Sequence, residues 1–230
     1  MPTNSNDKNR RISILPGKEH LILCEGKDDE KFISCFLNSD VFSAVDVNII
    51  QVQQVYGVDN LRLTVSVLTK SDGFSQLRSL LIIRDADNDI YSARQSVKGV
   101  FEKANLPIPP NEYQWNDNGK LKTGFLLMPL CSNESQTGAL DDLCWNILSG
   151  KHGSLIRDDV ACFIDSLEQA GKRSFIHKSK ALLHTYFSAT EGLIASSIGR
   201  ASDAGAFDWH SEKLNSLKDF LISMVQSDNN

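Results

Sequence analysis

Three carboxylates that follow apolar runs are the side chains of this sequence best suited to chemistry. Glu25 comes directly after the run 21–24, and Asp85 and Asp87, one residue apart, come just after the run 80–83. In an extended chain alternate side chains share a face, so Asp85 and Asp87 can point at one ion. Carboxylate oxygens suit Mg²⁺ or Mn²⁺, which bridge protein and phosphate groups. If the two runs are neighbouring strands, the pattern predicts a metal site that acts on a phosphate ester.

The same aspartates have a simpler interpretation. Asp85, Asp87, Asn88 and Asp89 are residue types that often form turns and begin helices, and a helical pattern follows them. A lone Asp-x-Asp favours this interpretation. Its combination with a strand that ends in Glu-Gly, about two strand-helix units earlier, favours the metal site. Asp89 is a further candidate ligand in the same run.

The elements that must position these carboxylates alternate between strands and helices. Apolar or β-branched runs predict strands at 20–24, 45–52, 79–83 and 124–128. Amphipathic patterns predict helices after the first three, including 60–69 and 90–104, and the proline-rich stretch 107–120 is expected to be a loop. Such alternation predicts an α/β fold with a mainly parallel, Rossmann-like sheet of about four strands flanked by helices. Ligands bind such sheets at the carboxyl ends of the strands.

The chain divides into three predicted segments. Residues 1–17 are polar and aperiodic, which predicts a flexible tail, and residues 18–150 hold the α/β domain. Residues 151–230 predict a C-terminal helical extension packed on the sheet domain. Helices are expected at 139–148, 158–170, 174–187 and 211–225, with a glycine-containing loop between the last two.

Composition narrows the classes of function. The chain has 230 residues, of which 41% are apolar, and a formal net charge of −5, which argues against coating nucleic acid by bulk charge. Its apolar runs are far shorter than the ~20 residues of a membrane span. Five scattered cysteines without a CxxC pair indicate reduced thiols and a cytoplasmic protein. The histidines show no zinc-binding spacing, and no Gly-x-Ser-x-Gly motif is present.

Together the runs LILCEGKDDEKF at 21–32 and LLIIRDAD at 80–87 resemble the motifs of the Toprim (topoisomerase-primase) domain family. The resemblance covers roughly 21–148, and it lies nearest to stand-alone Toprim-like proteins of unknown function and to OLD-type nucleases. It implies a Toprim sheet in which Glu25 is a general acid/base or a metal ligand and Asp85 and Asp87 bind Mg²⁺. OLD-type members carry a second acidic residue four positions after the glutamate, which falls on Asp29 and implies a two-metal site.

Further candidates have weaker signals, and each has an alternative interpretation. Lys27 is a candidate catalytic residue that balances phosphate charge beside Glu25, or a solvated lysine in a turn. Glu134 and Asp141 are candidate further ligands, or a solvated carboxylate and a helix cap. The candidate nucleic-acid-binding residues are Arg84, Lys178 and Lys180; the last two lie in a basic stretch with Lys172, Arg173 and His177 that also fits a charged helix face.

These observations predict a Mg²⁺-dependent endonuclease or related phosphoryl-transfer enzyme. The Toprim resemblance adds a phage-defence setting in which an ATPase partner couples energy from another chain. The alternative is a module that binds a metal-nucleotide or a partner protein without turnover. DNA, RNA and small phosphate compounds stay open as substrates, as do monomer and homodimer. Strand joining and primer synthesis are disfavoured, since no tyrosine is placed for a covalent DNA link.

Overall fold

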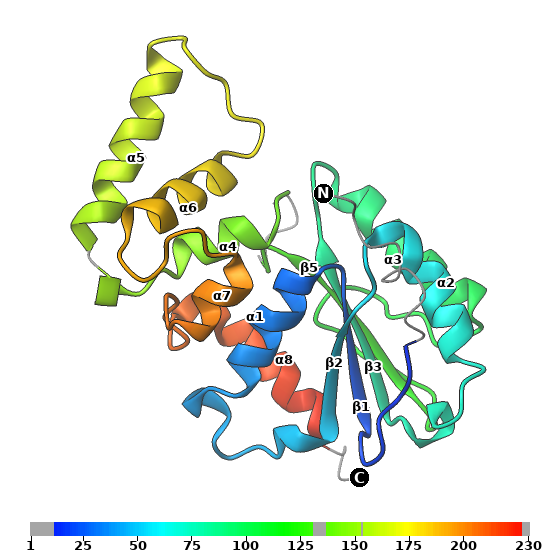
Figure 1. Ribbon diagram of the computed structural model, residues 1–230. Helices are drawn as coiled ribbons and strands as arrows, with labels where there is room; N and C mark the ends of the chain where they lie inside the picture. Colours follow the sequence, from blue (N-terminus) through cyan, green and yellow to red (C-terminus); the bar gives the residue numbers. More distant parts are fainter. Residues whose placement is uncertain (1–11, 131–136, 153, 227–230) are drawn as a thin grey trace, which may run out of the picture.

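The computed structural model describes residues 12–130, 137–152 and 154–226, and this part of the chain forms a five-stranded sheet (Figure 1). The strands are β1 His20–Cys24, β2 Ile50–Gln54, β3 Ser79–Asp85, β4 Asn116–Asp117 and β5 Lys122–Met128. Their spatial order is β2-β1-β3-β5-β4, and each neighbouring pair is parallel except β4 with β5. The predicted α/β fold with a mainly parallel sheet flanked by helices is confirmed.

The central strands are buried on both faces. All residues of β1 are buried, and so are the first six residues of β3. Parallel strands covered by helices on both sides need apolar side chains at consecutive positions, which is why the sequence shows unbroken runs there. The second strand begins later than predicted, because 47–49 form a 3₁₀ turn that Asp46 caps by accepting a hydrogen bond from the Asn48 amide at 3.0 Å.

Helices on the two faces of the sheet bury separate hydrophobic clusters. Helices α2 Val58–Leu68 and α3 Ile90–Lys103 cover one face, where Val65 and Phe101 pack with Leu23 and Ile82. Helix α1 Lys27–Leu37 covers the other face, and Phe32, Ile33 and Phe36 form its buried stripe. Figure 1 shows α1 with α7 and α8 on the side of the sheet opposite α2 and α3.

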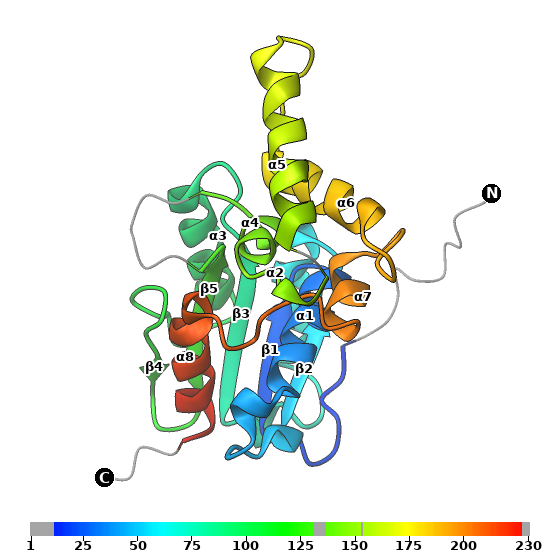
Figure 2. The same cartoon turned by 90° about the vertical axis from the view of Figure 1, so that its left-hand side faces the viewer.

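The helices that follow β5 make up most of the rest of the described chain. They are α4 Leu140–Asn146, α5 Ser154–Gln169, α6 Lys178–Ala189, α7 Ile198–Asp203 and α8 Asn215–Val225. Helix α7 falls within the loop expected between 187 and 211. Figure 2 shows α5 standing beyond the end of the sheet near α4. Helix α8 returns to the sheet, where Phe220 stacks on Trp115 with ring centroids 4.3 Å apart.

The segment before β1 also contacts the sheet. Ile12 is buried, the Leu15 amide donates to Gln51 Oε1 at 2.9 Å, and Gln51 Nε2 donates to the Ser13 carbonyl at 2.8 Å. Residues 12–17 of the predicted tail therefore line the β2 edge.

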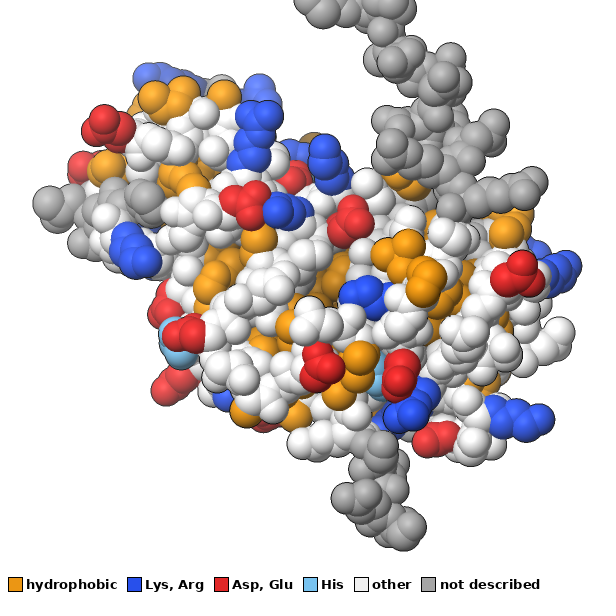
Figure 3. All heavy atoms as spheres, turned by 60° about the horizontal axis from the view of Figure 1, so that its bottom comes forward, with side chains coloured by type: hydrophobic (Ala, Val, Ile, Leu, Met, Phe, Trp, Pro, Cys, Tyr) orange, Lys and Arg blue, Asp and Glu red, His pale blue; other side chains and the backbone are white. Residues whose placement is uncertain are grey.

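The strand register sets the geometry of the site. Cys24 at the end of β1 pairs with Ile83 of β3, so the next residues, Glu25 and Arg84, are neighbours at the carboxyl edge of the sheet. The opposite end of the molecule carries interspersed acidic, basic and apolar side chains (Figure 3). Within the described ranges, none of the helices has both the length and the apolar content needed to cross a membrane.

Candidate active site at the carboxyl edge of the sheet

Four carboxylates gather where β1 and β3 end: Glu25, Asp29, Asp85 and Asp87, which we call the acidic rim. Glu25 follows β1 directly, and its side chain is 26% exposed. Its Oε2 atom is buried and has no hydrogen-bond partner among the described residues. Burial raises the pKa of Glu25; the Arg84 guanidinium opposes this rise, and the Asp87 carboxylate adds to it. The sheet therefore holds a carboxylate in an environment that disfavours its charge.

Asp29 lies in the first turn of α1 and is buried, with 8% of its surface exposed. Its Oδ2 accepts a hydrogen bond from the Gly26 amide at 3.0 Å, whereas Oδ1 is buried and has no partner among the described residues. Burial raises the pKa of Asp29 from 3.8 to about 6, and the charge of Glu25 contributes to the rise. Asp29 thus caps α1 with one oxygen and presents the other to the rim.

Asp85 ends β3 and faces the cluster that contains α1. Its Oδ1 accepts a hydrogen bond from the Leu140 amide at the start of α4, at 3.0 Å. Burial is the main cause that raises its pKa from 3.8 to about 8, followed by the charges of Asp29, Glu25 and Asp87. Such mutual effects require the carboxylates to be close together. The structure therefore brings together Glu25, Asp29 and Asp85, although Asp85 is distant in the sequence and the three residues belong to different elements.

Asp87 departs from the geometry expected of it. Its backbone is left-handed, with φ of 53°, so the extended alternation that would place Asp85 and Asp87 on one face ends there. The turn is fixed by two backbone hydrogen bonds with Gly138, at 2.9 and 2.8 Å. The Asp87 side chain is 59% exposed and lies at the open side of the rim. Asp85 and Asp87 thus reach the rim from different directions.

Arg84 lies among these carboxylates. Its side chain is only 7% exposed; one terminal nitrogen donates to Asp87 Oδ2 at 3.2 Å, and Nε lies 3.9 Å from Glu25 Oε2. The longer distance is an ion pair without a hydrogen bond. Nε instead donates to the Asp85 carbonyl at 3.0 Å. Arg84, predicted to contact nucleic acid, is turned inward and offsets part of the negative charge of the rim.

The carboxylates of the acidic rim are the type of ligand that divalent cations prefer, but their side chains do not enclose a metal site. Among the described residues, no group of three or more His, Cys, Asp and Glu side chains is arranged to hold a metal ion. The buried oxygens of Glu25 and Asp29 that accept no hydrogen bond among the described residues are hard ligand atoms, and Mg²⁺ usually keeps several of its waters. The rim therefore holds oxygen atoms of the type that Mg²⁺ binds, without a complete set of ligands.

A cavity of about 440 Å³ opens beside the rim, between the sheet edge and the start of α6. One wall carries the carboxylates of Asp85, Asp87 and Asp141, and the other carries His177 and Lys180. Half-buried Asp141 has a raised pKa, chiefly because of burial, and the charge of Lys180 counteracts the rise. The cavity thus combines oxygen ligands with a cationic wall, as a phosphate ester held through a metal ion requires.

The remaining predicted residues lie in varied places. Lys27 is exposed at the first position of α1, and its charge acts on Glu30. Asp89 caps α3 by accepting from the Ser92 amide at 3.0 Å. Lys178 forms ion pairs at 2.6 Å with Asp165 and with Glu168, both on α5. Glu134 lies outside the described residues.

One residue that shapes the cavity was missed by the sequence reasoning. Asp142 Oδ2 accepts from the Ala139 amide at 2.8 Å, and its Oδ1 accepts from Ser179 Oγ at 2.5 Å, which joins α4 to α6. The signal was available in part: an acidic residue three positions after a helix start is typical of a capping box. The partner Ser179 had no sequence signal.

Comparison with known proteins identifies a family whose function is unknown. The model of a family described as "Protein of unknown function (DUF3226)" matches residues 19–226, which include the whole acidic rim and α6. No curated protein and no solved structure matches the chain.

Proposed function

Since the chain belongs to the DUF3226 family, whose function is unknown, we propose its function from the site: divalent-metal-dependent hydrolysis of a phosphodiester bond in nucleic acid. The main observation behind this proposal is that Glu25, Asp29 and Asp85 lie close together, and that two of their buried oxygens accept no hydrogen bond from the described residues. Buried like charges destabilise one another. A bound cation would remove that penalty, because it favours the charged form of each ligand.

The division of roles follows from the positions of the side chains. Bound Mg²⁺ or Mn²⁺ would supply an activated water and stabilise the leaving oxygen. Asp85 and Asp29 would hold the ion from the sheet side, and Glu25 would act as a ligand or move a proton. Lys180 and His177, on the opposite wall of the cavity, would face the phosphate oxygens. The Toprim resemblance of the runs at 21–32 and 80–87 supports the same assignment.

The direct test is cleavage of nucleic acid by the purified chain. Plasmid, single-stranded DNA and RNA are incubated with Mg²⁺ or Mn²⁺, and with EDTA. We expect cleavage only with metal, and losses of at least 100-fold in Glu25→Gln and Asp85→Asn. Asp117→Asn is the matched control, because Asp117 is exposed at the other end of the sheet, where its Oδ1 accepts from the Gly119 amide and asparagine keeps that acceptor. Metal-dependent cleavage that is equal in all four proteins would refute the proposal.

One observation favours a second candidate, a module that binds a metal-nucleotide or a partner without turnover. Arg84 pairs with Asp87 and lies near Glu25, so part of the rim is already neutralised by the protein itself. Calorimetry with Mg²⁺ and nucleotides, run beside the cleavage assay, separates the two candidates. Saturable binding without cleavage of any substrate would select the module.

We also propose a cellular role on the basis of the resemblance to OLD-type nucleases. An OLD-like nuclease would act with an ATPase partner in phage defence, in the cytoplasm, where free thiols persist. The four cysteines among the described residues are free, which agrees with that compartment. Co-expression with an ATPase encoded beside this chain, followed by affinity capture of the tagged chain, tests the partnership.

A further inference from the structure

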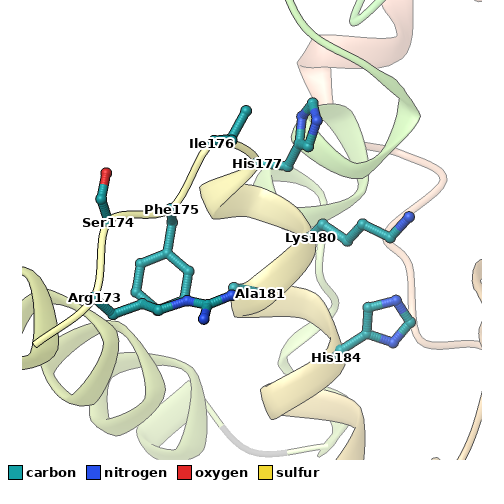
Figure 4. A pocket seen from close by; sticks show the side chains of 8 residues that line it. All are labelled: Arg173, Ser174, Phe175, Ile176, His177, Lys180, Ala181 and His184. Atoms are coloured by element: carbon teal, nitrogen blue, oxygen red, sulfur yellow. The ribbon is translucent and has the colours of Figure 1, made fainter.

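A second pocket, of about 410 Å³, lies on α6 next to the cavity at the acidic rim. Its floor is one face of the helix, formed by His177, Lys180, Ala181 and His184 at the spacing of successive turns. Its wall is the loop 173–176 that leads into the helix. Figure 4 shows Lys180 and His184 projecting from successive turns of α6, and the Arg173 side chain lying beside the ring of Phe175.

The loop wall carries a half-buried aromatic ring, packed against the core, and an exposed guanidinium group. The Arg173 guanidinium lies 5.8 Å from the centroid of the Phe175 ring, and Ile176 is 85% exposed beside it. Aromatic rings and planar guanidinium groups are the groups on which unpaired nucleobases stack. The wall therefore suits a flat, apolar group attached to an anion.

The helix floor supplies the positive charge. Lys180 is exposed and forms no ion pair with a carboxylate in the described part of the chain, whereas Lys178, two residues earlier, is held by Asp165 and Glu168. The charges of Lys180 and His184 do reach Asp141, whose pKa they lower against the effect of burial. Lys180 thus lines both the cavity that contains Asp141 and this pocket, where its charge is available to a phosphate.

The pocket and the cavity at the rim are neighbours, because both are lined by Ile176, His177 and Lys180. A chain held in the pocket by one nucleotide would therefore have its next phosphate near the cavity that Asp85 lines. The volume of the pocket falls within the range of small-ligand sites, about 300 to 1,000 Å³. Bases inside a duplex are stacked and paired, so they cannot offer a free face to Phe175.

We propose that the pocket formed by Arg173, Phe175, His177, Lys180 and His184 binds an unpaired nucleotide, and that the acidic rim acts on single-stranded nucleic acid. The action of the rim on single strands rests on the proposed function, whereas nucleotide binding by the pocket does not. Binding by stacking and charge tolerates every base, so little sequence preference is expected.

The test of the pocket is binding without cleavage. Fluorescence anisotropy in EDTA measures the affinity of the full chain for a labelled 12-nucleotide DNA, the same RNA sequence, and the blunt DNA duplex. Phe175→Leu keeps apolar packing but removes the ring, and Lys180→Gln removes the charge. Lys120→Gln is the matched control, because Lys120 is an exposed lysine at the amino end of the sheet.

We expect a single strand, of DNA or of RNA, to bind at least tenfold more tightly than the duplex. Loss of one stacked base corresponds to roughly a 5- to 150-fold weakening, which is the expectation for Phe175→Leu. Lys180→Gln should weaken binding at least fivefold, and Lys120→Gln less than twofold. A duplex that binds as well as the single strand would overturn the proposal, as would wild-type affinity in both pocket variants.

Cleavage and binding separate this proposal from the proposed function. Asp85→Asn should lose cleavage but keep single-strand binding in EDTA. If no substrate is cleaved but the pocket variants still lose binding, the proposed function fails and the pocket stands. If the wild type cleaves single strands, and the pocket variants bind and cleave them equally well, the pocket proposal fails and the proposed function stands.

Discussion

Replacing Asp85 by asparagine should stabilise the metal-free protein at high pH. The folded state holds a proton on Asp85 up to a pKa of about 8, whereas the unfolded chain releases it near 3.8. Between these values the unfolded chain binds fewer protons, so the free energy of unfolding falls as pH rises from about 4 to about 8. Asparagine does not titrate and keeps the oxygen that accepts from the Leu140 amide. The free energy of unfolding of the variant therefore does not fall for this reason as the pH rises.

The magnitude follows from the size of the pKa rise. Each unit corresponds to about 1.4 kcal/mol, so an isolated group that rises from 3.8 to about 8 would lose on the order of 5 kcal/mol. Asp85 is coupled to Asp29 and retains some exposure, which reduces the value. We expect Asp85→Asn to gain about 2 to 4 kcal/mol on the wild type between pH 5 and pH 8.

The assay is urea unfolding followed by tryptophan fluorescence, in EDTA, at pH 5 and pH 8. At each pH, the free energy of unfolding of the wild type is subtracted from that of the variant. Comparing this difference at pH 5 and pH 8 cancels any packing effect that does not depend on pH. Asp117→Asn is the matched control, because Asp117 is exposed at the other end of the sheet, where its Oδ1 accepts from the Gly119 amide and asparagine keeps that acceptor. An advantage of Asp85→Asn that is the same at both pH values would refute the reasoning.

Three further predictions test other parts of the structure. Mg²⁺ should raise the melting temperature more at pH 8 than at pH 6, because its binding displaces protons and weakens by about tenfold per pH unit below the pKa of Asp85; equal shifts by scanning fluorimetry would contradict this. Gly124→Ala should lower stability by about 1 to 3 kcal/mol in urea unfolding, since its Cβ would lie 2.7 Å from the Trp115 ring, whereas Gly99→Ala, with open space in α3, should not lower it. Ser179→Ala should lose about 1 to 3 kcal/mol with its hydrogen bond to an aspartate, and no change in unfolding would count against the α4–α6 contact.

Most of the sheet could be predicted from the sequence because buried parallel strands leave unbroken apolar runs, as at 20–24 and 79–83. Strand β4 could not, because its two residues, Asn116 and Asp117, have side chains that are typical of turns rather than of strands. Helix α7 was also missed, since it is six residues long and begins among the glycines of an expected loop.

The site was partly predictable for a similar reason. The sequence places Glu25 and Asp85 after strands, and adjacency of β1 and β3 brings them together. Two features of the site depend on contacts that only the folded structure shows. The left-handed turn at Asp87 is fixed by Gly138, about fifty residues away, and the inward direction of Arg84 depends on partners from β1 and the following turn. Long-range contacts of this kind leave no periodic signal in a single sequence.

Anomalous diffraction from a crystal soaked in MnCl₂ would show directly whether the acidic rim binds a divalent cation. We predict a manganese peak at the carboxyl edge of the sheet, within about 2.3 Å of oxygens from at least two of Glu25, Asp29 and Asp85. A fully soaked crystal with no peak there, and with Arg84 still between Glu25 and Asp87, would contradict the account.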